Sequence, residues 1–299
     1  MKSWLAFAAS SMAMACVHAA GPPPPPHPGP ALTAASEAPS TAAPPSPEVR
    51  WAPELGLELE AARVTGTIAW FDSASGVLSC SDPARCQQAV TPASTFKIPH
   101  SMIALEVGVV DGPDSVLPWD KQPYWNENWN RDLSFRDAFR VSCYPCYRDL
   151  AAKVGEQAER DWVAKLGYGN RDVSGGVGKF WIWGGLRISP LEQIDFLRRF
   201  DAGKLPISER TADIVRDVMT LDVTESYVLR GKTGSTSPPG EERELGWFVG
   251  WLEQGERRVF FALLLDGHEP GVEINPLRRP LTERILRSQG LMDVAPTAP

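Results

Sequence analysis

The sequence predicts a mixed α/β fold of the α+β kind, in which helices flank a central antiparallel sheet and a helical lobe is inserted. Three observations predict it. Strand-like segments occur near both ends of the folded part, helix-compatible spacing of apolar residues fills the middle, and no internal repeat interrupts this order. Strands that are distant in sequence therefore have to pair, and a functional site is expected where the lobe meets the sheet.

The first strands are expected as a hairpin, because residues 64–72 and 76–80 are strand-like and are joined across the short turn at 73–75. Strand character returns at 226–230, 246–252 and 259–265. The last of these is rich in apolar residues, as is typical of a strand that is buried on both faces.

Helices are expected where apolar residues recur on one helical face. Leu191, Ile194 and Leu197, for example, share such a face. The predicted helices span 94–107, 134–141, 147–153, 159–166, 189–200, 208–218 and 276–287.

The bulk composition indicates a globular protein with a large core. The chain has 299 residues, of which 43% are hydrophobic and 22% are charged. Its net charge is -7, and no block of Lys or Arg forms a stripe that would neutralise phosphates. The sequence therefore predicts no nucleic-acid partner.

The first twenty residues are typical of a signal peptide. Lys2 precedes an apolar run from Trp4 to Ala15 that is too short to span a bilayer. Two cleavage sites compete: a lipoprotein signal ending before Cys16, which would place a lipid anchor on that cysteine, and ordinary cleavage after Ala19. Either predicts a periplasmic or secreted protein with no integral membrane span after processing.

Residues 21–50 are rich in Pro and Ala and include an unbroken proline run from Pro22 to Pro26. Such a composition cannot bury a core, so we expect a disordered spacer. The folded domain is expected at 51–291, and residues 292–299 form a C-terminal tail.

Ser94 and Lys97 are the first candidate catalytic pair. They lie three residues apart at a predicted helix start, which places the hydroxyl and the amine on one helical face. A free lysine, with a pKa of about 10.4, is protonated at neutral pH and accepts no proton. Apolar neighbours would lower that pKa and create a base beside a nucleophile.

Lys232, Thr233 and Gly234 are expected at the end of a strand, where a cation and a hydroxyl bind an anionic substrate group. Gly234 would let the ligand lie against the backbone. The backbone N–H groups of Ser94 and Ser235 are expected to converge on a developing oxyanion.

In an exported protein cysteines are expected to pair. A bridge between Cys80 and Cys86 is favoured, whereas the state of Cys143 and Cys146 is left open, with a local disulfide beside Ser142 as one alternative. The second pair forms a C-x-x-C motif, but no thioredoxin-like pattern surrounds it.

The four histidines predict neither a metal site nor a Ser-His-Asp triad. We expect His100 to be an exposed helix residue; the alternative places it at a pocket rim. Trp125 belongs to an aromatic run at 124–130 and is predicted at the pocket rim, with core packing as the alternative for these tryptophans.

From residue 64 to 291 the chain resembles the class D, oxacillinase-type, serine β-lactamases, which share a fold with penicillin-binding transpeptidases. The resemblance rests on several short motifs, the most class-specific being Tyr-Gly-Asn and Phe-Trp. The matching residues are 92–99, 131–133 and 141–142, Tyr168-Gly169-Asn170, Phe180-Trp181, 186–189, Lys232-Thr233-Gly234, 250–251 and 276–278.

This resemblance implies that residues 51–291 form a catalytic domain that hydrolyses β-lactam antibiotics and confers resistance to them. It implies that Ser94 attacks the lactam carbonyl and that carbon dioxide carboxylates Lys97, which then serves as the base. Trp181 would hold the carbamate, and Phe96 and Ile182 would form its apolar surround. No metal or other cofactor is implied.

The same resemblance implies that Ser142 and Lys232 relay a proton toward the leaving nitrogen. Thr233 and Arg278 would hold the substrate carboxylate, next to Gly234 and Ser235. Tyr168-Gly169-Asn170 is expected to be mostly architectural.

The chain departs from the family where Ser-x-Val is replaced by Ser142-Cys143-Tyr144. Tyr144 would add a phenol to the residues that surround the carbamate, and this change affects the expected stability of the carbamate and the deacylation step. Two alternatives therefore stay open: a penicillin-binding or sensor module, and a D-alanyl-D-alanine peptidase, each of which acylates but deacylates slowly. A glycan-binding protein is a more distant alternative. The oligomeric state is not predicted.

Overall fold

The computed structural model describes residues 49–236 and 244–292. The predicted signal peptide, the spacer up to residue 48 and the tail from residue 293 lie outside the described residues. Both predicted domain boundaries need correction. Val49 and Arg50, assigned to the spacer, belong to strand β1, and Met292, assigned to the tail, is buried. Backbone pairing and apolar burial extend the folded domain by these residues.

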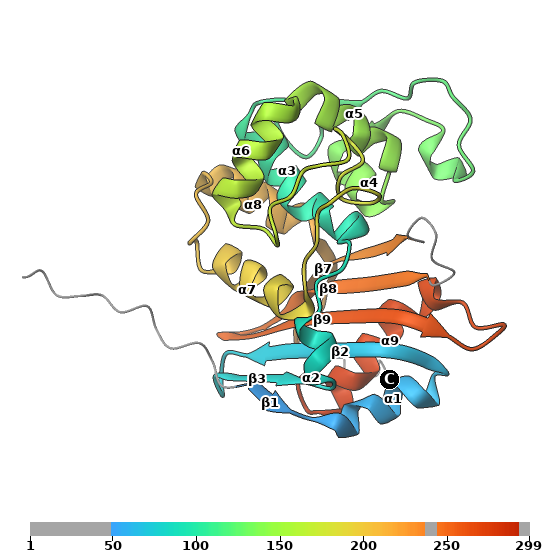
Figure 1. Ribbon diagram of the computed structural model, residues 1–299. Coiled ribbons are helices and arrows are strands. Elements are labelled where there is room, and N and C mark those ends of the chain that lie inside the picture. The colour runs from blue at the N-terminus through green and yellow to red at the C-terminus, as the bar shows by residue number, and fades with distance from the viewer. Residues whose placement is uncertain (1–48, 237–243, 293–299) are drawn as a thin grey trace, which may run out of the picture. The chain divides into compact units, whose positions relative to one another are not determined.

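A seven-stranded sheet organises the domain, with the order β1-β3-β2-β9-β8-β7-β6. Strand β2 pairs with β9 in antiparallel fashion, which joins the two ends of the folded chain (Figure 1). The predicted assembly from distant strands is confirmed, and β1 with β3 is a parallel pair within an otherwise antiparallel sheet. The strands are β1 (Val49–Trp51), β2 (Val64–Asp72), β3 (Val77–Cys80), β6 (Thr220–Val223), β7 (Val228–Thr236), β8 (Leu245–Gln254) and β9 (Arg257–His268).

A separate two-stranded ribbon pairs β4 (Val116–Leu117) with β5 (Leu133–Ser134). The predicted hairpin is confirmed as β2 and β3. Strand β6 was not predicted from the sequence. The strand predicted at 226–230 is β7, which extends to Thr236.

Each predicted helix is present, with shifted ends, and the predicted helix at 94–107 begins as a 3-10 turn. Ser134, Ser189 and Ser208 accept backbone N–H bonds at the starts of three helices, which fixes where those helices begin. The helices are α1 (Gly56–Ala61), α2 (Pro83–Gln87), α3 (Lys97–Glu106), α4 (Phe135–Arg140), α5 (Tyr144–Val154), α6 (Glu156–Leu166), α7 (Pro190–Asp201), α8 (Glu209–Val218) and α9 (Ile274–Ser288), with 3-10 turns η1 (Pro53–Leu55), η2 (Ala93–Phe96) and η3 (Glu127–Trp129).

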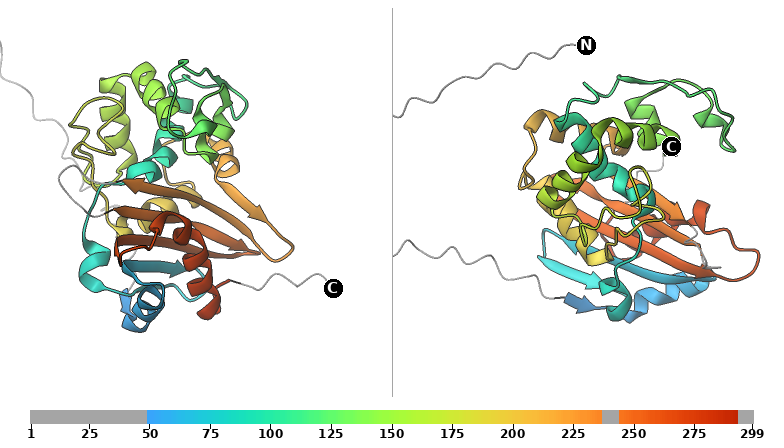
Figure 2. Two further views of the ribbon diagram at one scale, coloured as in Figure 1. Left: turned by 90° about the vertical axis from the view of Figure 1, so that its right-hand side faces the viewer. Right: turned by 45° about the horizontal axis from the view of Figure 1, so that its top comes forward.

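The sheet carries a hydrophobic core on each face. Helix α7 packs on one face, and α1 and α9 pack on the other (Figure 2). Alternate residues of β9 divide between the two cores: Phe260 and Leu264 face α7, whereas Phe261 and Leu263 face α9. Because both faces are covered, β8 is buried from Leu245 to Leu252 and β9 from Val259 to Leu265, as the apolar sequence of β9 predicts.

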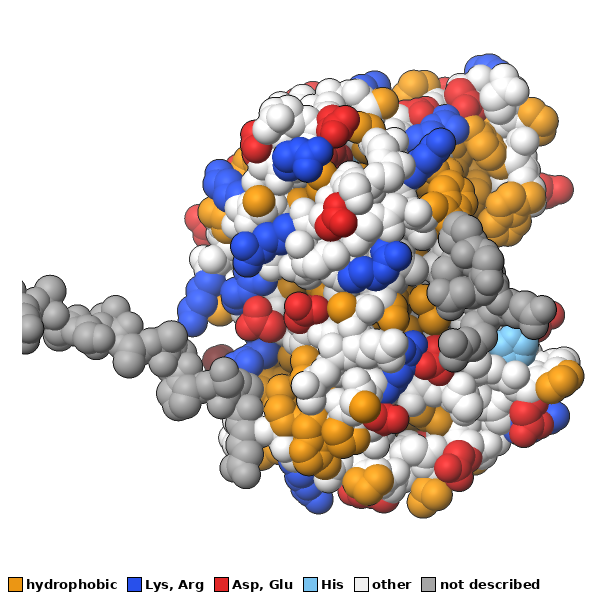
Figure 3. Space-filling view, viewed as in Figure 1, with side chains coloured by type: hydrophobic (Ala, Val, Ile, Leu, Met, Phe, Trp, Pro, Cys, Tyr) orange, Lys and Arg blue, Asp and Glu red, His pale blue; other side chains and the backbone are white. Residues whose placement is uncertain are grey.

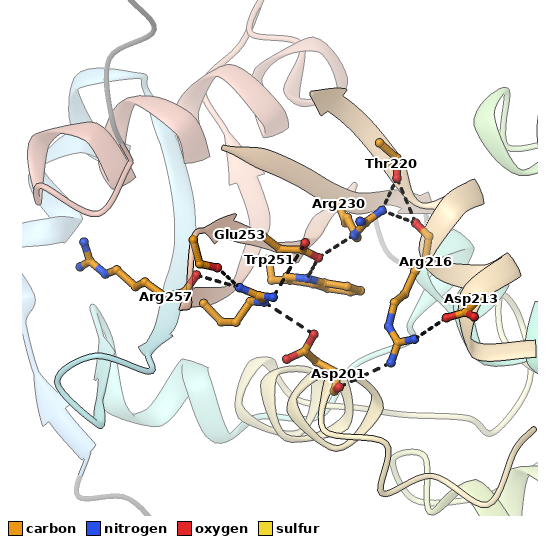
Figure 4. Close-up of polar contacts among 10 residues, drawn as sticks. Asp201, Asp213, Arg216, Thr220, Arg230, Trp251, Glu253 and Arg257 are labelled. Atoms are coloured by element: carbon orange, nitrogen blue, oxygen red, sulfur yellow. Dashed lines mark hydrogen bonds and ion pairs between the residues drawn. The ribbon is translucent and has the colours of Figure 1, made fainter. Parts of the chain in front are cut away.

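The helical lobe consists of α3, α4, α5, α6 and α8 and lies beyond β7 in Figure 1. Helix α3 is its centre, because its residues from Lys97 to Leu105 are all buried. A polar network near the start of β7 and the end of β8 joins these strands to α7 and α8 (Figure 4). There Arg230 donates to Glu253 Oε1 at 2.7 Å and to the carbonyl of Arg216 at 2.8 Å.

Candidate active site

Ser94 and Lys97 lie at the junction between η2 and α3. Ala93, just before them, has a φ of 50°, a left-handed conformation that turns the chain into the helix. Lys97 Nζ donates a hydrogen bond to Ser94 Oγ at 3.0 Å. Burial lowers the pKa of Lys97 from its ordinary value of 10.5 to about 7. A substantial fraction of this amine is therefore neutral near pH 7 and able to accept a proton.

Aromatic rings surround Lys97. The ring of Phe96 stacks on that of Trp181 at 5.3 Å, and Lys97 Nζ lies 5.0 Å from the centroid of Tyr147. Trp181 Nε1 is buried and has no hydrogen-bond partner among the described residues. A buried, unpaired donor is costly, so this indole is suited to hold an acceptor that binds in the site. Sequence reasoning missed Tyr147, because nothing in the spacing of α5 relates it to Lys97.

Ser142 and Lys232 form a second hydroxyl–amine pair. Ser142 has a φ of 56°, an uncommon conformation for a residue other than glycine. Lys232 Nζ donates to Ser142 Oγ at 3.0 Å and to the carbonyl of Thr233 at 2.9 Å. Burial, and then the nearby cations Lys97 and Arg278, hold the pKa of Lys232 well below its ordinary value.

Lys232, Thr233 and Gly234 lie within β7 and not at a strand end, so the predicted position is wrong by several residues. Pairing with β8 continues through Thr236 and sustains the longer strand. Gly234 has a different role from the one expected. A Cβ on it would lie 3.1 Å from the backbone nitrogen of Ser94. The absence of a side chain therefore lets η2 pack against β7, in addition to leaving the edge of the strand open to a ligand.

Arg278 reaches this strand from α9 and donates to the carbonyl of Gly234 at 2.7 Å. Burial lowers the pKa of Arg278 to about 10, and the guanidinium remains charged at neutral pH. Together with the Thr233 hydroxyl, it supplies the polar end of a cavity of about 480 Å³.

The cavity brings most of the predicted site residues together and has an aromatic rim. Trp125 is 85% exposed and lines this rim, as predicted, together with Trp129 and Trp183. Figure 3 shows hydrophobic side chains gathered beside the helical lobe. The cavity is lined by Ser94, Trp125, Asn126, Trp129, Val141, Ser142, Tyr144, Ile182, Trp183, Thr233, Gly234, Ser235, Thr236 and Arg278. The buried Phe96, Lys97, Trp181 and Lys232 are not among the lining residues.

Comparisons with known proteins agree with this geometry. The family model "Penicillin binding protein transpeptidase domain" matches residues 72–287. β-Lactamase OXA-10 from Pseudomonas aeruginosa is 35% identical over 237 residues, which are 79% of this chain and 88% of that relative. The chain belongs to the class D β-lactamase family. β-Lactamase OXA-48 from Klebsiella pneumoniae is 39% identical over 208 residues, 70% of this chain and 77% of that relative.

Solved structures of class D β-lactamases have the same fold. The enzyme from Sebaldella termitidis superposes with a TM-score of 0.78 and 32% identity over 83% of this chain and 100% of that one. The enzyme YbXI from Nostoc gives a TM-score of 0.75 and 37% identity over 80% and 99% of the two chains. The mixed α/β fold with the β-lactamase/transpeptidase architecture is thus confirmed.

The Tyr144 phenol of this class D β-lactamase is directed to a neighbouring loop. Its hydroxyl donates to the carbonyl of Gly178 at 3.2 Å, and its ring meets that of Trp183 edge to face at 5.7 Å. Tyr144 and Ile182 line the cavity with Ser94. Tyr168 is fully buried and lies within hydrogen-bonding distance of Gln193 and Thr95, as expected of an architectural residue.

The prediction for His100 is wrong. Its side chain is 0% exposed and does not line the cavity, because α3 is enclosed by the lobe on every side. Two disulfides are present: Cys80 is bonded to Cys86, as favoured from the sequence, and Cys143 is bonded to Cys146 beside Ser142, which the sequence left open.

Two negative findings concern the described part of the chain. Among its residues, no group of three or more His, Cys, Asp or Glu side chains is arranged to hold a metal ion. No helix within 49–236 or 244–292 is long and apolar enough to cross a membrane.

Proposed function

We propose that this enzyme hydrolyses β-lactam antibiotics through an acyl-enzyme on Ser94 and thereby confers resistance to them, after export to the periplasm or the exterior. The hydrogen bond of 3.0 Å from Lys97 Nζ to Ser94 Oγ carries the proposal. It joins a nucleophile to an amine that burial makes a proton acceptor near pH 7. The proposal about export includes two alternatives for processing, one of which leaves a lipid on Cys16 that tethers the enzyme to the membrane.

In acylation, Ser94 Oγ attacks the lactam carbonyl carbon and loses its proton to the base at Lys97. The backbone N–H groups of Ser94 and Ser235 stabilise the oxyanion, an effect worth about 3 kcal/mol per donor in other enzymes. The carbon–nitrogen bond of the ring then breaks, and the nitrogen takes a proton through Ser142, which Lys232 contacts at 3.0 Å. Thr233 and Arg278 bind the substrate carboxylate.

Carbon dioxide bound to Lys97 as a carbamate would supply a carboxylate base for acylation and deacylation. Two features support this modification: the neutral fraction of the buried amine, and the unpaired Trp181 N–H as a donor to hold it. Phe96, Ile182 and Tyr144 would exclude water around it.

Tyr144 favours a second candidate function, a penicillin-binding module that acylates but releases the product slowly. Its phenol stands in the wall of the cavity that contains Ser94. A group in that position obstructs the approach of the hydrolytic water. A D-alanyl-D-alanine peptidase that a β-lactam acylates would behave in the same way in a labelling experiment.

A time course of the intact protein mass after exposure to benzylpenicillin separates these functions. A β-lactamase gives an adduct that forms and disappears while the penicillin is consumed, and a sensor or peptidase gives a lasting adduct. Ser94→Ala should give no adduct, whereas Ser288→Ala, on the exposed end of α9, should behave as the native enzyme does. An adduct on Ser94→Ala would contradict the assignment of the nucleophile.

A further inference from the structure

His100 and Glu159 form a buried pair behind the catalytic lysine. His100 lies on α3, one helical turn beyond Lys97, and Glu159 lies on α6. His100 Nε2 is 2.7 Å from Glu159 Oε1, and the side chains are 0% and 1% exposed. Charged or strongly polar groups are rarely buried to this degree unless they are paired, so each residue accounts for the presence of the other.

The imidazole of His100 contacts the same rings that surround Lys97. Its centroid lies 5.3 Å from that of Trp181, 5.6 Å from that of Phe96 and 5.5 Å from that of Tyr147. His100 therefore supports the indole from behind. It is absent from the cavity lining, so its effect on the reaction has to pass through these rings.

The pair is closed to other polar partners in the described part of the chain. None of the four polar side-chain atoms of the pair makes a hydrogen bond there, so the 2.7 Å approach of Nε2 to Oε1 is their polar contact. The other titratable groups facing His100 are Lys97 on its own helix and Tyr147 on α5. Because no third group compensates the pair, removing one member leaves the other uncompensated in the protein interior, close to Lys97.

We propose that His100 and Glu159 are positioning residues whose pairing holds Trp181 in place behind Lys97, so that Lys97 becomes carboxylated. This inference rests on the proposed function. Without His100, Glu159 would lose the partner it contacts at 2.7 Å, and the indole of Trp181 would lose the ring that packs against it. Without Glu159, the imidazole would still support the ring, so the loss would be smaller.

The test is a double-mutant cycle of His100→Asn, Glu159→Gln and the double variant in the full enzyme. Two quantities are measured: the bicarbonate concentration that half-restores turnover of a chromogenic cephalosporin, and the carbamate signal in the ¹³C NMR spectrum with labelled bicarbonate. Val163→Ala is the matched control, since Val163 is fully buried on α6 but apolar. The thermal unfolding midpoint of Val163→Ala gives the effect of lost packing alone on stability.

We expect His100→Asn to raise the half-restoring bicarbonate concentration about tenfold, the equivalent of one pKa unit, and to weaken the carbamate signal. Glu159→Gln should raise it about threefold. The double variant should recover most of the loss seen in His100→Asn, because no buried Glu159 side chain is then left without its partner. If His100→Asn does not fold, the shift in Glu159→Gln decides the question.

An unchanged bicarbonate requirement in Glu159→Gln overturns the inference, as does an equal shift in Val163→Ala, which would assign the effect to packing. If the native enzyme turns over lactams and shows the carbamate signal, and every variant behaves as it does, only the role of the pair is refuted. A native enzyme without turnover or carbamate signal refutes the proposed function, and this inference with it.

Discussion

The amine nitrogen of Lys97 lies 3.0 Å from the hydroxyl oxygen of Ser94, in a site where burial brings the lysine pKa to about 7. Below pH 7 the amine is protonated and neither accepts the serine proton nor reacts with carbon dioxide. We expect kcat/KM to fall about tenfold per pH unit below pH 6 and to level off above pH 8. A pH profile with saturating bicarbonate checks this, and a flat acid limb would contradict it.

The same pKa shift affects stability in a defined direction. The folded pKa is lower than the unfolded value of 10.5, so the unfolded chain binds the extra proton between about pH 7 and 10.5. The contribution of Lys97 to the free energy of unfolding therefore rises with pH across that window and is least favourable below pH 7. Urea denaturation of the native enzyme and of Lys97→Met at several pH values isolates this contribution.

Trp181→Phe should keep the ring stack on Phe96 and remove the buried N–H donor. We expect deacylation to slow about a hundredfold, the lower range for impaired general base catalysis, because the carbamate base would lose the donor that holds it, and the acyl-enzyme should accumulate. Added bicarbonate should restore part of the rate. Rapid-quench mass spectrometry measures the adduct, and Trp251→Phe, which lies on β8 outside the site, is the control. Equal adduct lifetimes in the two variants would show that the Trp181 indole N–H has no special role.

Gly234→Ala should disrupt the contact between β7 and η2. The new Cβ would lie 3.1 Å from Ser94 N, Thr95 N and the carbonyl of Pro92, all of them backbone atoms. We expect about 1–3 kcal/mol of destabilisation and a loss of kcat, because Ser94 moves with this backbone. Gly56→Ala is the control, since nothing lies within 4 Å of the added methyl group and its φ is -60°. Equal unfolding free energies of the two variants would refute the steric argument.

The disulfide between Cys143 and Cys146 follows Ser142 directly. Replacing both cysteines by Ala should lower the free energy of unfolding by about 2 kcal/mol or less, as the chain-entropy estimate for so short a loop gives. It should also lower turnover, because Ser142 would lose the covalent restraint next to its left-handed backbone conformation. The Cys80/Cys86 double variant is the control. It should lose stability with turnover unchanged, and an equal loss of turnover in both would argue against a local effect.

Predictions from local spacing succeeded because neighbouring residues share one element. Helix geometry places Ser94 beside Lys97, three positions apart, and a short turn places β2 beside β3. The disulfide between the near neighbours Cys80 and Cys86 was favoured by the same reasoning. The ends of β7 were not predicted correctly, because pairing with β8, and not local propensity, extends that strand to Thr236.

The sequence alone determined the fold class, the family resemblance and the choice of Ser94 and Lys97 as the candidate hydroxyl and amine. The tertiary structure decided which faces of α3 are buried, and for that reason His100 is enclosed with Glu159 and Tyr147 lies near Lys97. It also placed Lys232 next to Ser142, 90 positions away in the chain. Periodicity indicates that two residues share a face, but burial and charge compensation depend on what packs against that face, and only the folded chain supplies it.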